Sequence, residues 1–386
     1  MKILICITYY RPHTSGLTIY AERLARAFAK RGHEVTVLTS QYDKELPREE
    51  FLDGVRIIRI PVLFRISKGV IMPSFGLMAN KYVLESDVIQ LHLPQFDAAG
   101  VALRGKILKK PTVITYHCDL KMPEGLLSWL ANQAVVMMNH LAALFTHRIV
   151  TYTNDYAKNS TFLSNYLDKV NVILPPVELP DVNDRNIQIF NDKWNQDERK
   201  PVIGMAARFA TEKGVEILLD ALPVILNKYP DAKVQFAGPY ENIIGEESYY
   251  KKLLPTINTY IKDNHWQFLG VLDPEEMSSF YKNIDVLVIP SLNSTEAFGL
   301  VQIEAMMNGK PSIASNLPGV RQPVKMHKMG EVVPIGNAEK LGEAVVKVLS
   351  NQQKYISDSG MISKNYEPDM IAERYEDLFN DIKTKL

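Results

Sequence analysis

The sequence contains few cysteines, since Cys6 and Cys118 are the only two among 386 residues. Two thiols cannot build a disulfide framework or a four-cysteine zinc site. Because disulfides are typical of secreted domains, this content favours a reducing, cytoplasmic environment. The eight histidines are scattered, and no pair of them has metal-ligand spacing, so we expect no metal site.

The chain also lacks an excess of charge of one sign. It has 44 Lys and Arg residues against 44 Asp and Glu residues. This balance disfavours a nucleic-acid-binding protein, and we expect no nucleic-acid partner. Hydrophobic residues make up 46% of the chain, which excludes intrinsic disorder.

No apolar run is long enough for a targeting or spanning segment. The opening run, Met1–Ile7, is too short for a signal peptide. The longest apolar stretch, Leu126–Phe145, contains Ser128, Asn132 and Asn139, whereas a spanning helix needs about 20 nearly all apolar residues. These observations predict a cytoplasmic protein.

The first forty residues predict a strand–helix–strand unit. A strand is expected over Lys2–Thr8, a glycine-containing loop over Tyr9–Thr18, a helix over Ile19–Arg31 and a second strand over Val35–Thr39. Such a βαβ unit requires a parallel sheet. Further strands of this half are expected at Val55–Ile60, Val88–His92, Thr112–Tyr116, Arg148–Tyr152 and Val170–Ile173.

The same pattern returns after a stretch rich in Pro, Asp and Asn at 175–200. A strand over Pro201–Ala207, a loop over Arg208–Gly214 and a helix over Val215–Lys228 open the second half. Its later strands are expected at Ala232–Ala237, Trp266–Leu269, Val286–Pro290 and Ser312–Ser315, and its later helices at Pro274–Lys282, Gly299–Asn308 and Ala338–Leu349.

The predicted fold class is therefore α/β, with two Rossmann-like doubly wound domains. We assign residues 1–178 to an N-terminal domain, 179–200 to a linker and 201–367 to a C-terminal domain. The pattern of residues 368–386 predicts an amphipathic helix that could pack on either half. We assign this helix to the N-terminal domain. Ligands of such sheets bind outside the carboxyl ends of the strands, so we expect the site in a cleft between the domains.

Two charged motifs follow strands of the second half. Arg208 and Lys213 lie where a strand end meets a helix start, which suits a diphosphate, although a solvated loop would look the same. Glu296 and Glu304 flank the start of the helix that Gly299 opens, where an anion and sugar hydroxyls could bind. The alternative is that Glu296 caps this helix and Glu304 lies on the surface.

With these motifs combined, the chain resembles the GT-B-fold glycosyltransferases, and among them the retaining glycosyltransferase family 4, or glycosyl transferases group 1. The resemblance rests on RFATEKG (208–214), FAGP (236–239), EAFGLVQIE (296–304), SIASNLPG (312–319), and the Gly16 loop followed by RGHEVTVLT. It spans nearly the whole chain.

The resemblance implies a role for each matching residue. Arg208 and Lys213 would stabilise the leaving nucleoside diphosphate, Glu296 would contact the donor sugar, and Glu304 would hold the ribose hydroxyls. His117 matches a histidine of the active-site cleft. The remaining donor-binding positions are Gly16, Gly238, Val271, whose backbone would read the base, and the amides of Phe298, Gly299 and Leu300.

The implied activity is a metal-independent transfer of a sugar, with retained configuration, from a UDP- or GDP-linked donor to a glycan or lipid-linked acceptor. No tightly bound cofactor is expected, and the oligomeric state is not predicted. A phosphorylase or epimerase of the same fold and a non-catalytic nucleotide-binding module remain alternatives. A dehydrogenase is disfavoured, because the first loop lacks the Gly-x-Gly-x-x-Gly motif.

Some features admit two interpretations. His92, at a strand end, could touch the acceptor, but a satisfied core histidine is the favoured interpretation. Asp97 and Asp119 could bind an acceptor hydroxyl or cap helices. One interpretation of two segments is that they dock on the inner face of an anionic membrane. These segments are the apolar stretch Leu126–Phe145, with Trp129, Met137 and Met138, and the basic residues Arg104, Lys106, Lys109 and Lys110. The favoured interpretation is a buried helix beside a solvated basic helix.

Overall fold

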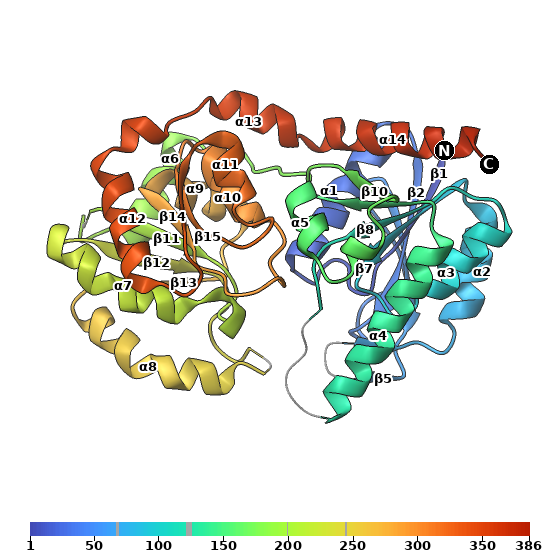
Figure 1. The fold of residues 1–386 in the computed structure, drawn as a ribbon, viewed down its shortest axis with the longest axis horizontal. Coiled ribbons are helices and arrows are strands. Elements are labelled where there is room, and N and C mark those ends of the chain that lie inside the picture. Colours follow the sequence, from blue (N-terminus) through green and yellow to red (C-terminus); the bar gives the residue numbers. More distant parts are fainter. Residues whose placement is uncertain (67–68, 121–125, 199, 244) are drawn as a thin grey trace. The chain divides into compact units, whose positions relative to one another are not determined.

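The computed structural model describes residues 1–386 except 67–68, 121–125, 199 and 244. The chain divides into two compact units. Unit 1 comprises Met1–Val177 and Asn365–Leu386, and unit 2 comprises Glu178–Lys364. Each unit contains its own sheet with helices around it (Figure 1).

The sheet of unit 1 has eight strands in the order β10-β9-β8-β7-β1-β2-β4-β3. All neighbours pair in parallel except β3 and β4. The strands are β1 (Lys2–Cys6), β2 (Glu34–Gln41), β3 (Glu49–Leu52), β4 (Val55–Pro61), β7 (Val88–Leu93), β8 (Thr112–Tyr116), β9 (Arg148–Thr151) and β10 (Val170–Val172). A separate hairpin pairs β5 (Phe64–Ile66) with β6 (Gly69–Ile71).

The helices of unit 1 lie between its strands in the chain, except α14, which returns to this unit after unit 2. They are α1 (Gly16–Lys30), α2 (Phe75–Glu85), α3 (Ala98–Ile107), α4 (Leu126–Phe145), α5 (Asn154–Asn159) and α14 (Pro368–Thr384). Strands β7 and β8 are buried over their whole length, as expected for a parallel sheet covered on both faces. The strand order changes direction between β1 and β7, which makes their carboxyl ends the topological switch point.

The sheet of unit 2 has six parallel strands in the order β13-β12-β11-β14-β15-β16. They are β11 (Val202–Ala206), β12 (Lys233–Ala237), β13 (Trp266–Gly270), β14 (Val286–Ile289), β15 (Ser312–Ser315) and β16 (Gly330–Val333). The helices are α6 (Asp184–Trp194), α7 (Val215–Lys228), α8 (Glu247–Lys262), α9 (Pro274–Asn283), α10 (Leu300–Met307), α11 (Gln322–His327), α12 (Ala338–Ser350) and α13 (Ser359–Tyr366), which ends in unit 1.

The predicted fold class, two Rossmann-like α/β domains, is confirmed. Both switch points have the same construction, since β11 and β14 are the unit 2 counterparts of β1 and β7. The start of the first helix differs from the prediction. Helix α1 begins at Gly16, because the Ser15 side chain accepts a hydrogen bond from the Thr18 amide and caps the helix there.

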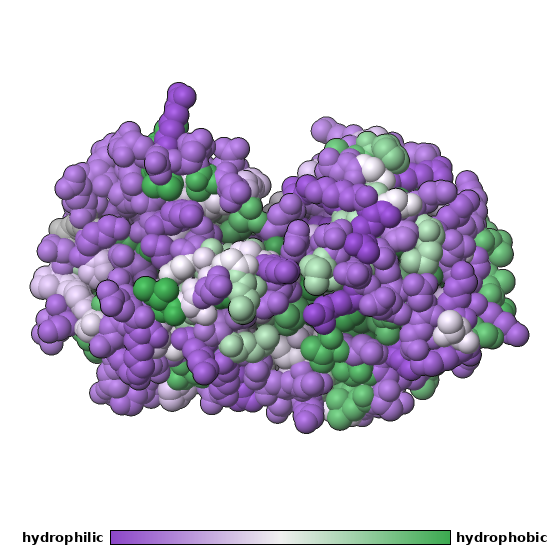
Figure 2. Space-filling view, turned by 90° about the horizontal axis from the view of Figure 1, so that it is seen from above, coloured by the Kyte–Doolittle hydropathy of each residue, from purple (hydrophilic) through white to green (hydrophobic). Residues whose placement is uncertain are grey.

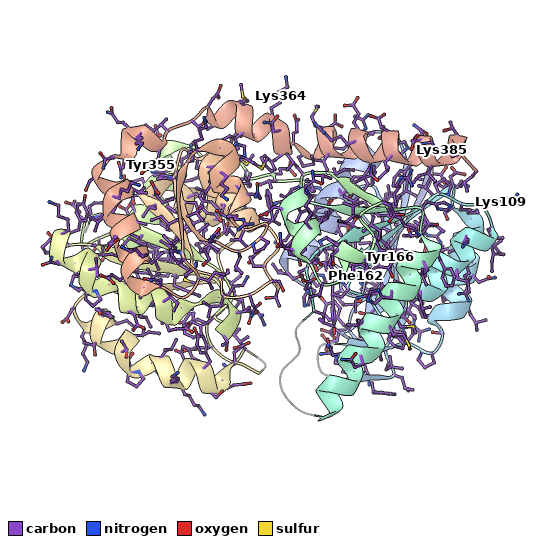
Figure 3. All side chains as sticks on the ribbon, viewed as in Figure 1. Lys109, Phe162, Tyr166, Tyr355, Lys364 and Lys385 are labelled. Carbon is purple, nitrogen blue, oxygen red and sulfur yellow. The ribbon has the colours of Figure 1, made fainter. Side chains whose placement is uncertain are left out.

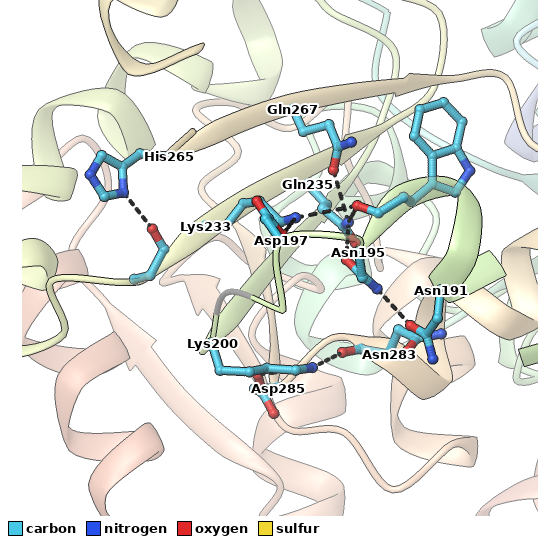
Figure 4. A network of polar contacts seen from close by, with 12 residues as sticks. Asn191, Asn195, Asp197, Lys200, Lys233, Gln235, His265, Gln267, Asn283 and Asp285 are labelled. Atoms are coloured by element: carbon cyan, nitrogen blue, oxygen red, sulfur yellow. Dashed lines mark hydrogen bonds and ion pairs between the residues drawn. The ribbon is translucent and has the colours of Figure 1, made fainter. Parts of the chain in front are cut away.

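The stretch 179–200, expected to be a linker, contains helix α6 and belongs to unit 2. Its end is held by a polar network on β12 (Figure 4). The buried ammonium of Lys233 donates to Asp197 Oδ1 at 2.7 Å and to the Trp194 carbonyl at 3.2 Å. Gln235 Nε2 donates to Asn195 Oδ1 at 2.7 Å. A buried cation needs a partner, and this segment supplies it.

The C-terminal helix α14 packs on α1 of unit 1. The Arg31 guanidinium donates to both Glu376 carboxylate oxygens, at 2.6 and 2.9 Å, and His33 Nε2 lies 2.8 Å from the first of them. Seen from the α14 side, the molecular surface is mainly hydrophilic, with apolar groups in separate clusters (Figure 2). The apolar face of α14 is therefore turned inward, and Ile371, Tyr375 and Phe379 are fully buried.

Tyr375 ties α14 to the sheet through two buried hydrogen bonds. Its hydroxyl lies 2.7 Å from the Tyr20 hydroxyl and 2.8 Å from Thr115 Oγ1. All three side chains are fully buried. Helix α14 thus continues the hydrogen-bonding of unit 1 rather than resting on its surface.

We predict that Tyr375→Phe lowers the free energy of unfolding by about 1–3 kcal/mol, because Tyr20 and Thr115 lose a partner without access to water. Urea denaturation followed by circular dichroism measures this loss. The control is Tyr229→Phe, whose hydroxyl bonds to Ser350 at an exposed position and should matter little. Equal stability of both variants would contradict the prediction.

Candidate functional site

The residues singled out in the sequence divide between the two units. Gly16 and His117 lie in unit 1, and Arg208, Lys213, Gly238, Val271 and the Glu296–Glu304 segment lie in unit 2.

The loop after β11 carries both predicted cations of unit 2, and two glycines let it pack closely. Gly214 has φ +68°, and a Cβ there would lie 2.3 Å from the Pro290 carbonyl oxygen at the end of β14. Gly238, after β12, has φ +133°, and a Cβ there would lie 2.1 Å from the Ala207 oxygen. A side chain at either position would push the loop off the neighbouring strand end.

The loops after β11 and β14 are bonded to each other. The Leu292 amide donates to the Glu212 carbonyl at 2.9 Å. The Lys213 ammonium donates to Glu296 Oε2 in a short, partly buried ion pair. Arg208 pairs with the Glu212 carboxylate at 2.5 Å. The structure therefore brings Arg208, Lys213 and Glu296 together at the switch point of unit 2.

Lys213 remains a cation in this setting. Burial acts to lower the pKa of Lys213, but the charge of Glu296 and the hydrogen bond to it outweigh burial, so the pKa is raised above its ordinary value of 10.5. Both cations of the loop hold a carboxylate in the described structure. An incoming anion would therefore compete with these carboxylates for the two cations.

Helix α10 begins at the end of the Glu296 loop. Gly299, with φ +80°, is its N-cap and supplies no side-chain bond, so the first amides of α10 are not capped by a side chain. The buried Gln302 holds this helix start, because its Nε2 donates to the carbonyls of Phe298 at 3.0 Å and Val320 at 2.8 Å. Leu300 is the first helical residue.

Neither alternative interpretation of the two glutamates holds. Glu296 pairs with Lys213 and does not cap α10. Glu304 is only 8% exposed, and its carboxylate accepts a hydrogen bond of 2.8 Å from the buried Tyr281 hydroxyl. Tyr281, on α9, is a contact that the sequence pattern did not reveal.

Val271 follows the end of β13. The amide of Gly238 donates to the Gly270 carbonyl at 2.7 Å, which joins the loops after β12 and β13. The Val271 side chain is 68% exposed. An exposed apolar side chain beside a fixed loop is compatible with the base-reading position that the resemblance implies.

In unit 1, His117 belongs to a buried hydrogen-bonded chain. Its Nε2 lies 2.8 Å from His92 Nδ1, and its Nδ1 lies 2.5 Å from the Tyr152 hydroxyl. Burial lowers the pKa of His92 to about 3, and burial together with His92 holds the pKa of His117 well below 6.5. Both imidazoles are therefore neutral at physiological pH.

A cavity of about 450 Å³ lies at the carboxyl ends of β1 and β7. His92 lines it, whereas His117 does not; Ser15, Leu17 and Thr18, next to Gly16, also line it. Of the two histidines, His92 is thus the one that lines a cavity. It is a core histidine, as favoured, since it is 1% exposed and its Nδ1 is bonded to His117, but its Nε2 has no hydrogen-bond partner among the described residues. The signal available in the sequence was its position at the end of β7.

The two aspartates singled out in unit 1 differ as the two histidines do, because Asp97 is among the residues that line the cavity and Asp119 is not. Asp119 accepts hydrogen bonds from Tyr116 at 3.0 Å and from Ser160 at 2.5 Å, which is a structural role. Asp97 lines the cavity, and its side chain does not cap α3. Burial raises the pKa of Asp97 from 3.8 to about 6.

Among the residues that the structure describes, no group of three or more His, Cys, Asp or Glu side chains is arranged to hold a metal ion. Also among them, no helix combines the length and the hydropathy needed to cross a membrane. Both cysteines carry free thiols.

Two family models match the chain. Residues 14–179 match the model described as Glycosyltransferase Family 4, and residues 186–366 match the model described as Glycosyl transferases group 1. An uncharacterized glycosyltransferase of Methanocaldococcus jannaschii is 28% identical, with 97% of this chain and 96% of that protein aligned. The phosphatidyl-myo-inositol mannosyltransferase of Mycobacterium leprae is 24% identical over 100% of this chain and 98% of that protein.

The fold is also that of solved structures. The crystal structure of Anabaena HepE in complex with UDP has a TM-score of 0.76 and 18% identity, over 99% of this chain and 100% of that chain. At this identity the likeness shows the fold alone.

We predict that Asp97→Asn raises the free energy of unfolding by about 1–3 kcal/mol at pH 7, because a charged Asp97 is costly to bury. The folded pKa lies above the unfolded value, so the cost is present above pH 6 and disappears as pH falls from about 6 to 3.8. The stabilisation should therefore shrink across that window. Urea denaturation at pH 7 and pH 4.5 checks it, with the exposed Asp168→Asn as control; a gain independent of pH would contradict the prediction.

Proposed function

The chain belongs to the glycosyltransferases that these two family models describe, and on this premise we propose a retaining, metal-independent transfer of a sugar from a nucleotide-sugar donor to a hydroxyl of a glycan or lipid-linked acceptor. That the protein is a glycosyltransferase follows from its family. The donor, the stereochemistry, the acceptor and the residue roles are the proposal. The matches give no support to a phosphorylase, an epimerase or a non-catalytic module.

The observation that carries the proposal is the position of Arg208 and Lys213 beside Glu296 at the switch point of unit 2. Breaking a sugar–phosphate bond leaves negative charge on the diphosphate and positive charge on the anomeric carbon. Two cations and the amides of Phe298, Gly299 and Leu300 at the start of α10 would stabilise the departing anion. Glu296, once released from Lys213, would accept hydrogen bonds from the donor sugar.

The nucleoside would occupy the opposite side of this phosphate site. We assign the ribose hydroxyls to Glu304, whose carboxylate is already oriented by Tyr281. We assign the base to the loop of Val271. We also propose that Gly214 and Gly238, where a side chain would not fit, allow the phosphates to approach the backbone of their loops closely. HepE, which shares the fold, binds UDP, and we propose UDP or GDP as the nucleotide.

The acceptor would bind in unit 1. The relative from Mycobacterium leprae is named for transfer to phosphatidyl-myo-inositol, a lipid. His117 would then act through His92, since His92 faces the cavity. Gly16 keeps its proposed place at the start of α1, where a ligand would meet the amide end of the helix.

A contact of unit 1 with an anionic membrane is part of the proposal. Exposed apolar side chains lie on three adjacent helices, with Leu77 of α2 80%, Ile107 of α3 68% and Leu144 of α4 54% exposed. Lys106 lies on α3. Lys109 follows the end of this helix, and its side chain points away from the helix (Figure 3). We call these five residues the α2–α4 surface. Apolar groups beside lysines suit a bilayer surface.

Two of the four basic residues named for this contact have another role. Arg104 donates to the carbonyls of Gly100 at 2.8 Å and Gly76 at 3.2 Å. Lys110 donates to the carbonyl oxygens at the end of α2. Arg104 and Lys110 keep their charge but are half-buried, whereas Lys106 and Lys109 are exposed, so we assign the contact with lipid headgroups to these two lysines.

We predict that Lys213→Ala weakens UDP binding by about tenfold to a hundredfold, because a charge-assisted bond to the diphosphate is lost. Glu296→Gln should keep or tighten UDP binding, since it no longer competes for Lys213, yet reduce transfer at least a hundredfold. Calorimetry with UDP and turnover of UDP-sugars measure these effects. Lys340→Ala, at an exposed lysine paired with Glu343, is the control.

The expected changes in UDP affinity differ in direction between Lys213→Ala and Glu296→Gln, and this difference makes the test specific. A merely destabilised loop would weaken UDP binding in both variants. Unchanged UDP affinity in Lys213→Ala would place the phosphate site elsewhere.

We predict that the protein sediments with phosphatidylcholine vesicles only when they contain phosphatidylglycerol. Lys106→Glu with Lys109→Glu should reduce this binding at least tenfold, at about 1 kcal/mol per lysine. The matched control is Lys251→Glu with Lys252→Glu, on α8 of unit 2. Equal loss in both double variants would argue against the α2–α4 surface.

A further inference from the structure

The cavity of unit 1 is lined mainly by apolar side chains. They come from α1, β6, the loop after β7 and α4, and include Leu17, Val70, Ile71, Phe96, Ala134 and Val135. Its volume, about 450 Å³, lies within the range of about 300–1,000 Å³ that is usual for small-molecule sites. An apolar lining of this kind does not suit a diphosphate or an unsubstituted sugar.

The cavity occupies the switch point of its sheet. Thr8 and Tyr9 follow β1, and His92 and Pro94 come from the end of β7. Ligands of open α/β sheets bind at this place, because adjacent strand ends lead into loops on opposite faces. The fold and the lining therefore point to the same site.

Two buried polar side chains, His92 and Gln95, are among the residues that line this apolar space. His92 Nε2 and both terminal side-chain atoms of Gln95 have no hydrogen-bond partner within the described parts of the chain. His92 is 1% and Gln95 2% exposed. A buried polar atom without a partner is costly, so a ligand that supplies the partner should bind about five- to a hundredfold more tightly.

The hydrogen-bonded chain behind His92 fixes the orientation of its ring. His92 Nδ1 is engaged by His117, and His117 is engaged in turn by Tyr152. Only Nε2 of His92 is left to meet a ligand, and a neutral imidazole nitrogen pairs well with a hydroxyl. This nitrogen of His92 thus suits an uncharged hydroxyl as its partner.

We propose that this cavity binds the apolar part of the acceptor, an alkyl chain or an aromatic ring next to the hydroxyl that receives the sugar, and that His92 Nε2 and Gln95 hold that hydroxyl. The word acceptor rests on the proposed transferase function, whereas the binding of such an amphiphile does not. A lipid and an aromatic alcohol share this chemistry, and the experiment separates them.

The probes are octyl, phenyl and methyl β-D-glucosides, as free monomers, with the full-length chain. Their binding is measured by calorimetry with and without UDP. Octyl or phenyl glucoside should bind at least tenfold more tightly than methyl glucoside, since each buried methylene adds about three- to fourfold. A preference for octyl identifies a lipid chain, and a preference for phenyl identifies an aromatic acceptor. Equal affinity for all three overturns the proposal.

Variants locate the binding. Ala134→Phe fills the cavity and should abolish the preference for the apolar glucoside, whereas Met137→Phe, on the same helix but 55% exposed, should keep it. UDP affinity should stay the same in both. If Ala134→Phe retains the preference, the cavity is not the site. If UDP does not bind to the unmodified protein, the proposed function fails but the apolar subsite stands.

Two replacements of His92 test the role of its Nε2. His92→Asn keeps a polar atom near His117 and removes the one facing the cavity, and it should weaken binding of the apolar glucoside at least threefold. His92→Gln carries a polar atom at the outer position and should restore part of the affinity. Affinity equal to the unmodified protein in His92→Asn overturns the role of His92.

Discussion

The ion pair between Lys213 and Glu296 is the contact on which the site of unit 2 depends. It joins the loops that follow β11 and β14, the two strands on either side of the switch point. The bond from the Leu292 amide to the Glu212 carbonyl holds the same two loops by their backbones. A donor phosphate that takes Lys213 from Glu296 leaves this backbone link in place. The site can therefore exchange one anion for another without losing its shape.

In unit 1 the comparable element is a series of hydrogen bonds and one ring contact that begins at helix α14. Glu376 fixes α14 against Arg31, and Tyr375 bonds to Tyr20. The edge of the Tyr20 ring lies against His117, with centroids 4.9 Å apart, and His117 orients His92 at the cavity. The last helix of the chain thus supports a cavity formed by its first half. This is a physical reason for the chain to return to unit 1 after completing unit 2.

Most strands and the glycine loops could be predicted from the sequence, because buried parallel strands are continuous apolar runs that end at Gly, Pro or charged residues. The short strand β3 and helix α6 could not. Strand β3 has an exposed, polar sequence, and α6 is held by Lys233 and Gln235, which lie far from it along the chain.

Prediction of the site residues from the sequence has the same limit, because contacts between residues far apart along the chain are not visible in it. Motif spacing selected Arg208, Lys213, Glu296 and Glu304, whose environment is largely local to unit 2. It could not rank His92 against His117, or Asp97 against Asp119. Each pair lies at the ends of β7 and β8, and the packing of α4 and of Tyr152 and Tyr156 decides which member faces the cavity.

The two sites hold their titratable groups in different states. In unit 2 both cations are paired, Arg208 with Glu212 and Lys213 with Glu296, so they are kept ready for an anionic leaving group. In unit 1 burial keeps His92 and His117 neutral, whereas Asp97, whose pKa is raised to about 6, is ionised at pH 7. An acceptor hydroxyl is neutral, and a neutral imidazole pairs with it without the cost of desolvating a cation. The neutral imidazoles of unit 1 therefore suit an acceptor hydroxyl, while the paired cations of unit 2 suit departure of the diphosphate.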